Sequence, residues 1–362
     1  MNPGPGRYTS AEILSQPETW AKCLRELRET NQLRELSRAM PSGVEWLFIG
    51  CGSSFYVAQV AAATWSLLTG ENARAAPASE VLLFPKTLPA KCQPVVISRS
   101  GRTSEAVEAT NYLERQLGLR TLAITCESGT PIEEASTYVI RLLAADEKST
   151  VMTRSFSSML LALQALAAVR AGREDFLDAL QRLPEKADGW LAKALAVAEK
   201  AVNSQDFGDY VFLGQGPFFG IAQEATLKIT EMSCSYAQSF HTLEFRHGPK
   251  AIVSSNTLLT FFLGESGLGA ETAVLQEMKA LGAKTLVIVN RTNSAITKAA
   301  DFLIELALDV PEAARAVAAL FPGQWLGLQT ALRKGFNPDE PRNLTRVVML
   351  DGEEGGGLKR GA

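Results

Sequence analysis

Histidine, cysteine and clustered positive charge are scarce in this sequence, and each scarcity excludes a class of function. The 362 residues include two histidines and five scattered cysteines. No cysteine pair has the spacing of a metal site, so we expect reduced thiols and no metal. Lysine and arginine form no run, and the net charge is −3. The sequence therefore predicts no nucleic-acid partner.

Long apolar runs and the common nucleotide fingerprints are also missing. No stretch approaches the roughly 20 apolar residues of a membrane-spanning helix, and the N-terminus has no signal pattern. We therefore expect a cytoplasmic protein with no membrane partner. The Walker A spacing does not occur, and the turn Gly50-Cys-Gly52 lacks the third glycine of a dinucleotide motif. Neither a nucleoside triphosphate nor any other cofactor is expected.

The sequence does contain apolar strands that alternate with helices, and this pattern occurs twice. In the first half, strands are predicted at 44–49, 75–83, 93–98, 121–125 and 138–143; in the second half, at 210–213, 257–263, 285–289 and 302–306. Such alternation is typical of a parallel α/β sheet. The turns match as well, because Gly50-Cys-Gly52 corresponds to Gly214-Gln-Gly216, and residues 98–101 correspond to 264–267. The sequence therefore predicts an internal duplication of one α/β domain.

Five segments follow from this pattern. We expect an N-terminal helical segment at 1–40 and a first α/β domain at 41–171. A helical connector at 172–204 then leads to a second α/β domain at 205–350 and a flexible tail at 351–362.

The first domain carries hydroxyl groups at two strand-to-helix turns. Ser53 and Ser54 follow the first strand, and Ser98, Ser100 and Thr103 follow the third. Backbone N–H groups and hydroxyls at the start of a helix can bind an anion, and two such turns suit a phosphate monoester. A helix that is capped by serine and threonine, with no ligand, explains the second turn equally well.

The second domain carries charge on one helix. Glu224, Lys228 and Glu231 fall at i, i+4 and i+7, so they share a face. A solvated salt-bridge face is the ordinary interpretation of such a line. The segment that follows the helix, residues 234–245, is too apolar for a surface loop and leads to His247. Two carboxylates, a lysine and a histidine within 24 positions indicate a proton-transfer site.

Together, six motifs resemble the sugar isomerase (SIS) family. They are Gly50-Cys-Gly-Ser-Ser, Ser98-Arg-Ser-Gly-Arg-Thr, the connection 149–156, the helix 223–231, Glu244-Phe-Arg-His-Gly-Pro and Pro341-Arg-Asn-Leu. The pattern is similar to the isomerase half of glucosamine-6-phosphate synthase, and to stand-alone amino-sugar-phosphate deaminases and ketose/aldose isomerases. The resemblance implies two tandem SIS domains, each a doubly wound, flavodoxin-like three-layer sandwich with a mainly parallel five-stranded sheet.

The resemblance also implies roles for the site residues. The sugar phosphate would be held by Ser53, Ser54, Ser98, Ser100 and Thr103. Glu231 would move a proton between sugar carbons 1 and 2, with Lys228 assisting and Glu224 alongside. His247 would open the sugar ring in the site of a neighbouring subunit, which implies a homodimer with a shared active site.

Two departures from the synthase pattern narrow the expected reaction. The sequence begins at the isomerase half, so we expect no release of ammonia from glutamine. Arg346 stands where the synthase has a lysine that can form a Schiff base, and a guanidinium cannot form one. We therefore expect a sugar-phosphate isomerase or deaminase. The alternatives are a glutamine-dependent aminotransferase that is completed by a separate subunit, and a non-catalytic sugar-phosphate sensor.

Overall fold

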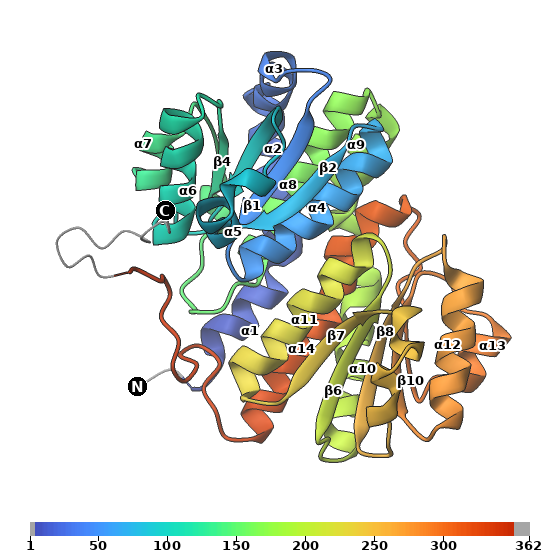
Figure 1. Cartoon of the computed structure of the whole chain (residues 1–362). Helices are drawn as coiled ribbons and strands as arrows, with labels where there is room; N and C mark the ends of the chain where they lie inside the picture. Colours follow the sequence, from blue (N-terminus) through green and yellow to red (C-terminus); the bar gives the residue numbers. More distant parts are fainter. Residues whose placement is uncertain (1–3, 351–362) are drawn as a thin grey trace. The chain divides into compact units, whose positions relative to one another are not determined.

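The computed structural model describes residues 4–350 as two compact units, each with its own sheet (Figure 1). The first unit comprises residues 18–147, 154–177 and 345–350. The second comprises residues 4–17, 148–153 and 178–344. The expected flexible tail at 351–362 lies outside the described residues. None of the helices in residues 4–350 has the length and hydrophobicity that a membrane crossing requires.

The first unit is built on a parallel sheet whose strand order is β2-β1-β3-β4-β5. Its strands are β1 (Glu45–Gly50), β2 (Ala73–Pro77), β3 (Cys92–Ile97), β4 (Leu122–Thr125) and β5 (Tyr138–Arg141). Its helices are most of α2 (Gln16–Glu29), then α3 (Gln32–Ala39), α4 (Ser53–Thr69), α5 (Ala78–Leu83), α6 (Ser104–Asn111), α7 (Pro131–Ala135) and α8 (Arg154–Ala171).

The second unit repeats this order, because its sheet reads β7-β6-β8-β9-β10 and every pair is parallel. The strands are β6 (Asp209–Gly214), β7 (Ala237–His241), β8 (Thr257–Leu263), β9 (Lys284–Val289) and β10 (Phe302–Glu305). The helices are α1 (Arg7–Leu14), α10 (Ala187–Ser204), α11 (Pro217–Ser233), α12 (Leu268–Ala280), α13 (Ser294–Ala299) and α14 (Ala316–Arg333), while α9 (Glu174–Arg182) crosses the unit boundary. Both sheets have the flavodoxin-like order, which confirms the predicted fold class.

Alternate residues of the second sheet point to its two faces, and each face has its own helices. Val211, Leu213 and Phe261 belong to a buried cluster with Val274 and Leu275 of α12. The other face packs against α11 and α14, as the stacked pair Phe212 and Phe262 and the contact between Gly323 of α14 and Phe262 indicate. Figure 1 shows α12 and α13 on one side of the sheet and α11 and α14 on the other.

Some elements of the structure differ from the expected ones or were not expected. The strand expected at 75–83 is a short strand, β2, followed by helix α5, and the change comes at Pro77, which lacks an N–H for a ladder. Strand β7 was not predicted, because its residues Ala237–His241 mix polar and apolar side chains and are half-buried on a sheet edge. Helix α13 was also missed, since it is only six residues long.

Candidate active site

The first turn of each unit has the same backbone geometry. Gly52 has φ 54° and ψ −127°, and Gly216 has φ 54° and ψ −129°. A Cβ on Gly50 would lie 2.4 Å from the carbonyl oxygen of Ser54, and a Cβ on Gly214 would lie 2.3 Å from that of Phe218. Glycine is therefore required for the helix to start this close to its strand, and the predicted match between the two turns is confirmed.

The predicted phosphate-binding residues lie at the carboxyl ends of two strands of the first sheet. Strands β1 and β3 are parallel neighbours, so the turns that follow them lie side by side. Ser53 and Ser54 begin α4, and both side chains are buried. Ser98 and Ser100 are buried after β3, and Thr103 is the N-cap residue of α6. The chain continues from β1 to β2 on one side and from β3 to β4 on the other. The carboxyl ends of β1 and β3 are therefore the switch point, where open α/β sheets bind ligands.

The second of these turns is held by its own hydroxyls. Ser98 Oγ accepts a hydrogen bond from the Gly101 N–H at 3.1 Å, and Ser100 Oγ accepts one from the Arg102 N–H at 3.2 Å. Gly101 has φ 62°, and a Cβ there would lie 2.4 Å from Thr130 Oγ1. These contacts fit a capped turn as well as an anion site, so they do not decide between the two interpretations.

The end of the described chain lies over the same turn. Ser104 donates its N–H to the Val348 carbonyl at 3.3 Å, and its Oγ accepts the N–H of Leu350 at 3.0 Å. Arg346 forms ion pairs with Glu127 at 3.2 Å and Asp146 at 2.5 Å. The Arg346 carbonyl also accepts a hydrogen bond from the Arg99 guanidinium at 3.0 Å. The Arg346 side chain is therefore held by two carboxylates of the first unit.

The corresponding turn of the second unit is filled by the chain itself. Ser266 donates its N–H and its hydroxyl to the Glu312 carboxylate, at 3.2 and 2.5 Å. A Cβ on Gly264 would lie 2.4 Å from the same carboxylate, and Gly267 has φ −108° where Gly101 has φ 62°. The predicted match between these two turns therefore does not extend to their conformation. A carboxylate already occupies the donors of the second turn.

Helix α11 holds the predicted charged line as a compact group. Lys228 Nζ lies 3.2 Å from a Glu224 oxygen and 2.6 Å from a Glu231 oxygen. The side chains of Glu224 and Lys228 are 0% exposed, and that of Glu231 is 19% exposed. The solvated salt-bridge face, the ordinary interpretation of this spacing, is therefore wrong. Glu231 is the carboxylate of the group that solvent can reach.

Burial of this group depends on close packing between α11 and α14. A Cβ on Gly323 would lie 2.7 Å from Ala225 Cβ, and one on Gly327 would lie 2.9 Å from the Lys228 carbonyl oxygen. Burial alone would lower the pKa of Lys228, but Glu224 and Glu231 outweigh it, so that pKa is raised above its ordinary value. Buried ion pairs seldom stabilise a fold over apolar residues, so this group indicates a functional site.

Replacing Lys228 with methionine is expected to destabilise the protein strongly. The substitution keeps the volume but leaves the buried Glu224 carboxylate without its counter-ion, at a cost of about 3–5 kcal/mol in the free energy of unfolding. Urea unfolding of the variant and the wild type would measure the loss. The matched control is Lys279→Met, which breaks a partly exposed ion pair with Asp301 and should cost less than about 1 kcal/mol. Equal losses in both variants would contradict the prediction.

His247 lies apart from the α11 group within one chain. It sits on the crossover 242–256, which joins β7 to β8 through short 3-10 turns at Glu244–Arg246 and Pro249–Ile252. Phe245 is fully buried in the cluster on the α12 face of the sheet, whereas α11 packs on the opposite face. The His247 side chain itself is exposed. One chain therefore does not bring His247 to Glu231.

The apolar segment before His247 is only partly buried. We expected residues 234–245 to be covered as a whole, but Cys234 is exposed and Tyr236 is 65% exposed. Phe245 lies in the core of its own unit, so no partner is needed to explain its burial. Cys234 and Tyr236 both lie before β7, in the short connection between α11 and that strand.

The structure adds residues that the sequence did not single out. His241 ends β7, and its ring stacks on Phe219 with centroids 3.7 Å apart. Burial lowers its pKa, against the opposing effect of Glu244. Glu271 is fully buried and accepts a hydrogen bond from Thr242 Oγ1 at 2.7 Å; burial raises its pKa despite this bond. No spacing pattern in the sequence marked either residue.

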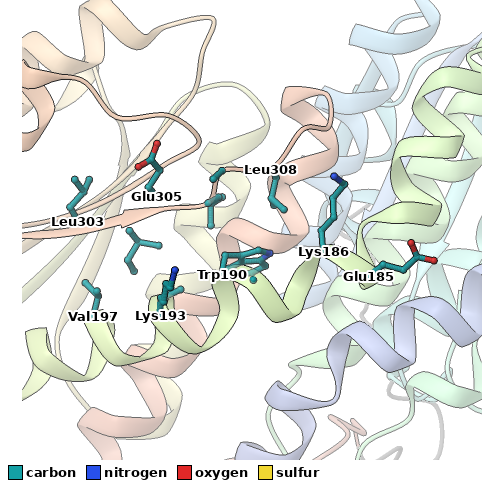
Figure 2. Close-up of a pocket in the computed structure, with 13 residues that line it drawn as sticks. Glu185, Lys186, Trp190, Lys193, Val197, Leu303, Glu305 and Leu308 are labelled. Atoms are coloured by element: carbon teal, nitrogen blue, oxygen red, sulfur yellow. The ribbon is translucent and has the colours of Figure 1, made fainter.

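A pocket of about 710 Å³ lies in the second unit between α10 and the end of β10 (Figure 2). Trp190 and the side chains of Leu303 and Leu308 line it, and Lys193 and Glu305 are exposed at its rim. None of the predicted site residues lines this pocket. Its volume suits a small ligand, but it lacks a buried charged group like that of α11.

Two parts of the chain match one known family. The SIS domain family matches residues 45–169 and 208–322. The chain belongs to the SIS domain family. The predicted resemblance is confirmed, and the two matches make this a tandem SIS protein.

Known proteins similar to this tandem SIS protein include aminotransferases, a deaminase and an isomerase. The glutamine–fructose-6-phosphate aminotransferase (isomerizing) of Pyrobaculum aerophilum is 27% identical over 96% of this chain and 58% of that protein. The corresponding protein of Methanothermobacter thermautotrophicus is 25% identical over 84% of this chain and 51% of that protein. The chain thus spans little more than half the length of these curated relatives.

Two solved structures are similar over nearly the whole chain. A glucosamine-6-phosphate deaminase from Thermotoga maritima has 29% identity and a TM-score of 0.75, covering 94% of this chain and 100% of that one. A tagatose-6-phosphate ketose/aldose isomerase from Escherichia coli has 22% identity and a TM-score of 0.83, covering 98% and 100%. The second likeness shows a shared fold.

Proposed function

We propose that the protein is a cytoplasmic phosphosugar isomerase or deaminase. It would interconvert an amino-sugar 6-phosphate, such as glucosamine 6-phosphate, and a ketose 6-phosphate, such as fructose 6-phosphate. The observation that carries the proposal is the buried α11 group, in which Lys228 and Glu224 are inaccessible and Glu231 reaches solvent. Five free cysteines fit the reduced compartment that the proposal assigns.

Glu231 is the proposed proton carrier. Its carboxylate would take the proton from C2 of the open-chain amino sugar and return it to C1, through an enediol-like or enamine-like intermediate. Lys228 donates a hydrogen bond to Glu231 at 2.6 Å, which fixes the orientation of the carboxylate. Glu224 binds Lys228 from the other side and keeps it charged. In the deaminating direction, water would hydrolyse the resulting C2 imine to the ketose and ammonia.

The phosphate is proposed to bind in the first unit. Ser53, Ser54, Ser98, Ser100 and Thr103 present hydroxyls at the switch point of that sheet. In the second unit the corresponding turn is already filled by Glu312, which favours a single phosphate site for each chain. Binding energy from the phosphate would orient carbons that lie away from it.

His247 is the proposed acid or base for opening the sugar ring, because its exposed imidazole can both accept and donate a proton. Within one chain the second sheet lies between the His247 crossover and α11. The proposal therefore includes a homodimer in which His247 serves the site of the partner. The protein would then need two copies of the chain for activity.

Two alternatives remain, and one of them has a specific observation in its favour. The curated relatives named above are aminotransferases, which favours a glutamine-dependent activity that is completed by another polypeptide. Against it, Arg346 is engaged with Glu127 and Asp146 and cannot form a Schiff base. A sugar-phosphate sensor would have no use for the costly buried charges of α11.

A substrate panel tests the proposal. Hexosamine and hexose 6-phosphates would be assayed in parallel for ammonia release and for ketose formation, with and without glutamine. Ammonia together with a ketose indicates the deaminase, and aldose–ketose interconversion indicates the isomerase. Turnover that requires glutamine would favour the aminotransferase, and no turnover on any member would favour the sensor.

Sugar phosphates are expected to stabilise the protein more than the same sugars without phosphate. The hydroxyl turns of the first unit would contact the phosphate, and a ligand that binds the native state raises Tm by mass action. A ligand at about 100 times its Kd stabilises by roughly 2.7 kcal/mol. The measurement compares Tm with glucosamine and with glucosamine 6-phosphate, at matched ionic strength. Equal shifts in Tm from the two compounds would contradict the proposed phosphate site.

A further inference from the structure

The crossover that carries His247 is attached to α12 by two carboxylates. At its start, Thr242 Oγ1 donates to Glu271 at 2.7 Å. Around His247 itself, Arg246 Nε and Lys250 Nζ both donate to Glu277, at 2.7 and 2.8 Å. Glu277 therefore binds the residue immediately before His247 and the residue three positions after it.

The short segment between these anchors contains neither an α-helix nor a strand. It consists of two 3-10 turns joined at Gly248, which has φ 127°. Phe245 is its fully buried side chain, in the cluster that includes Val274 and Met278 of α12. The His247 side chain is exposed, so its position depends on the backbone around it.

We infer that Glu277 is a positioning residue, which holds His247 in the orientation needed for ring opening. One carboxylate with two cationic partners closes a five-residue span of chain, from Arg246 to Lys250, around His247. Lys250 and Arg246 hold the pKa of Glu277 below its ordinary value, so the carboxylate is charged at neutral pH. The inference rests on the proposed role of His247.

Positioning of His247 explains this arrangement better than a contribution to folding stability does. The side chains of Arg246, Lys250 and Glu277 are each about a third exposed or more, and such pairs contribute little to folding. Lys279 on the same helix forms a comparable pair with Asp301, at 2.6 Å, away from the crossover. This pair supplies a matched control, because its loss leaves the crossover untouched.

The test replaces Glu277 with glutamine in the full chain and uses glucosamine 6-phosphate as the probe. We expect kcat to fall by roughly threefold to thirtyfold with KM changed by less than about twofold, since a misplaced catalytic group loses rate rather than binding. Amide hydrogen exchange in residues 243–250 should accelerate, on the order of tenfold, as the segment opens locally. Lys279→Gln should leave kcat, KM and this exchange unchanged.

Histidine NMR gives a reading that is independent of activity. The chain has two histidines, and His241 is fixed by its stacking on Phe219. Glu277→Gln should therefore move the ring signals of His247 while those of His241 stay in place. Unchanged His247 signals and unchanged kcat in Glu277→Gln would overturn the inference and leave the proposed function standing. If His247→Ala retains wild-type turnover, His247 has no role in the reaction and the inference fails with that role.

Discussion

Glu231→Gln is expected to lower turnover of the sugar phosphate by roughly 10²–10⁴-fold, the usual contribution of a general acid or base. The amide keeps the shape of the side chain and can still accept a hydrogen bond from Lys228. It cannot take a proton from carbon. Because Glu231 is 19% exposed at the surface of an otherwise buried group, the fold should tolerate the change.

Steady-state kinetics and ligand-induced Tm shifts would be measured on the same preparation. The expected pattern is a large fall in kcat, with the Tm shift on sugar-phosphate binding retained, because Glu231 acts on C1 and C2 and the phosphate binds elsewhere. The comparison variant is Glu224→Gln, whose side chain is fully buried and pairs with Lys228. Near-normal turnover in Glu231→Gln, with a large loss in Glu224→Gln, would transfer the proton-carrying role to Glu224.

Mixing two inactive variants is expected to restore activity. Glu231→Gln and His247→Ala chains, unfolded together and reassembled, should regain up to about a quarter of wild-type activity, because half of the dimers are mixed and each mixed dimer has one intact site. The physical reason is the position of His247 on the α12 face of the second sheet, opposite α11. Within one chain, the second sheet separates this crossover from α11.

The controls are each variant refolded alone, and mass spectrometry or tagged chains to show that mixed dimers have formed. Recovery of activity without mixed dimers would indicate contamination with wild-type protein. If mixed dimers form and no activity returns, His247 acts in its own subunit or outside catalysis.

Much of the fold was predictable from local pattern. Alternating apolar strands and helices determine a parallel α/β sheet, and the glycine pairs at 50–52 and 214–216 indicate a strand-to-helix turn that other residues cannot form. The repeated turn then predicts the duplication. Strand β7 was not predictable in this way, because an edge strand with half-buried residues lacks the apolar run of a central strand.

The charged residues of the site were predictable from the sequence, but their burial was not. The spacing of Glu224, Lys228 and Glu231 shows that they share a helix face, yet the same spacing is typical of solvated salt bridges. What buries them is α14, which approaches through Gly323 and Gly327, about 100 residues further along the sequence. Long-range pairings such as Glu312 with Ser266, or Glu277 with Arg246, leave no trace in local pattern, because each depends on how the sheet brings distant segments together.

In the proposed reaction, a carboxylate of this protein moves a proton between C1 and C2 of a sugar phosphate. Incubation in D₂O tests it most directly, with wild-type protein, Glu231→Gln and each member of the substrate panel, followed by NMR of the recovered sugar. Deuterium is expected to enter C1 or C2 with wild-type protein, and both deuterium entry and conversion are expected to be far slower with Glu231→Gln, while other positions stay protonated. Equal rates of deuterium entry and of conversion with the two proteins would contradict a proton transfer by Glu231.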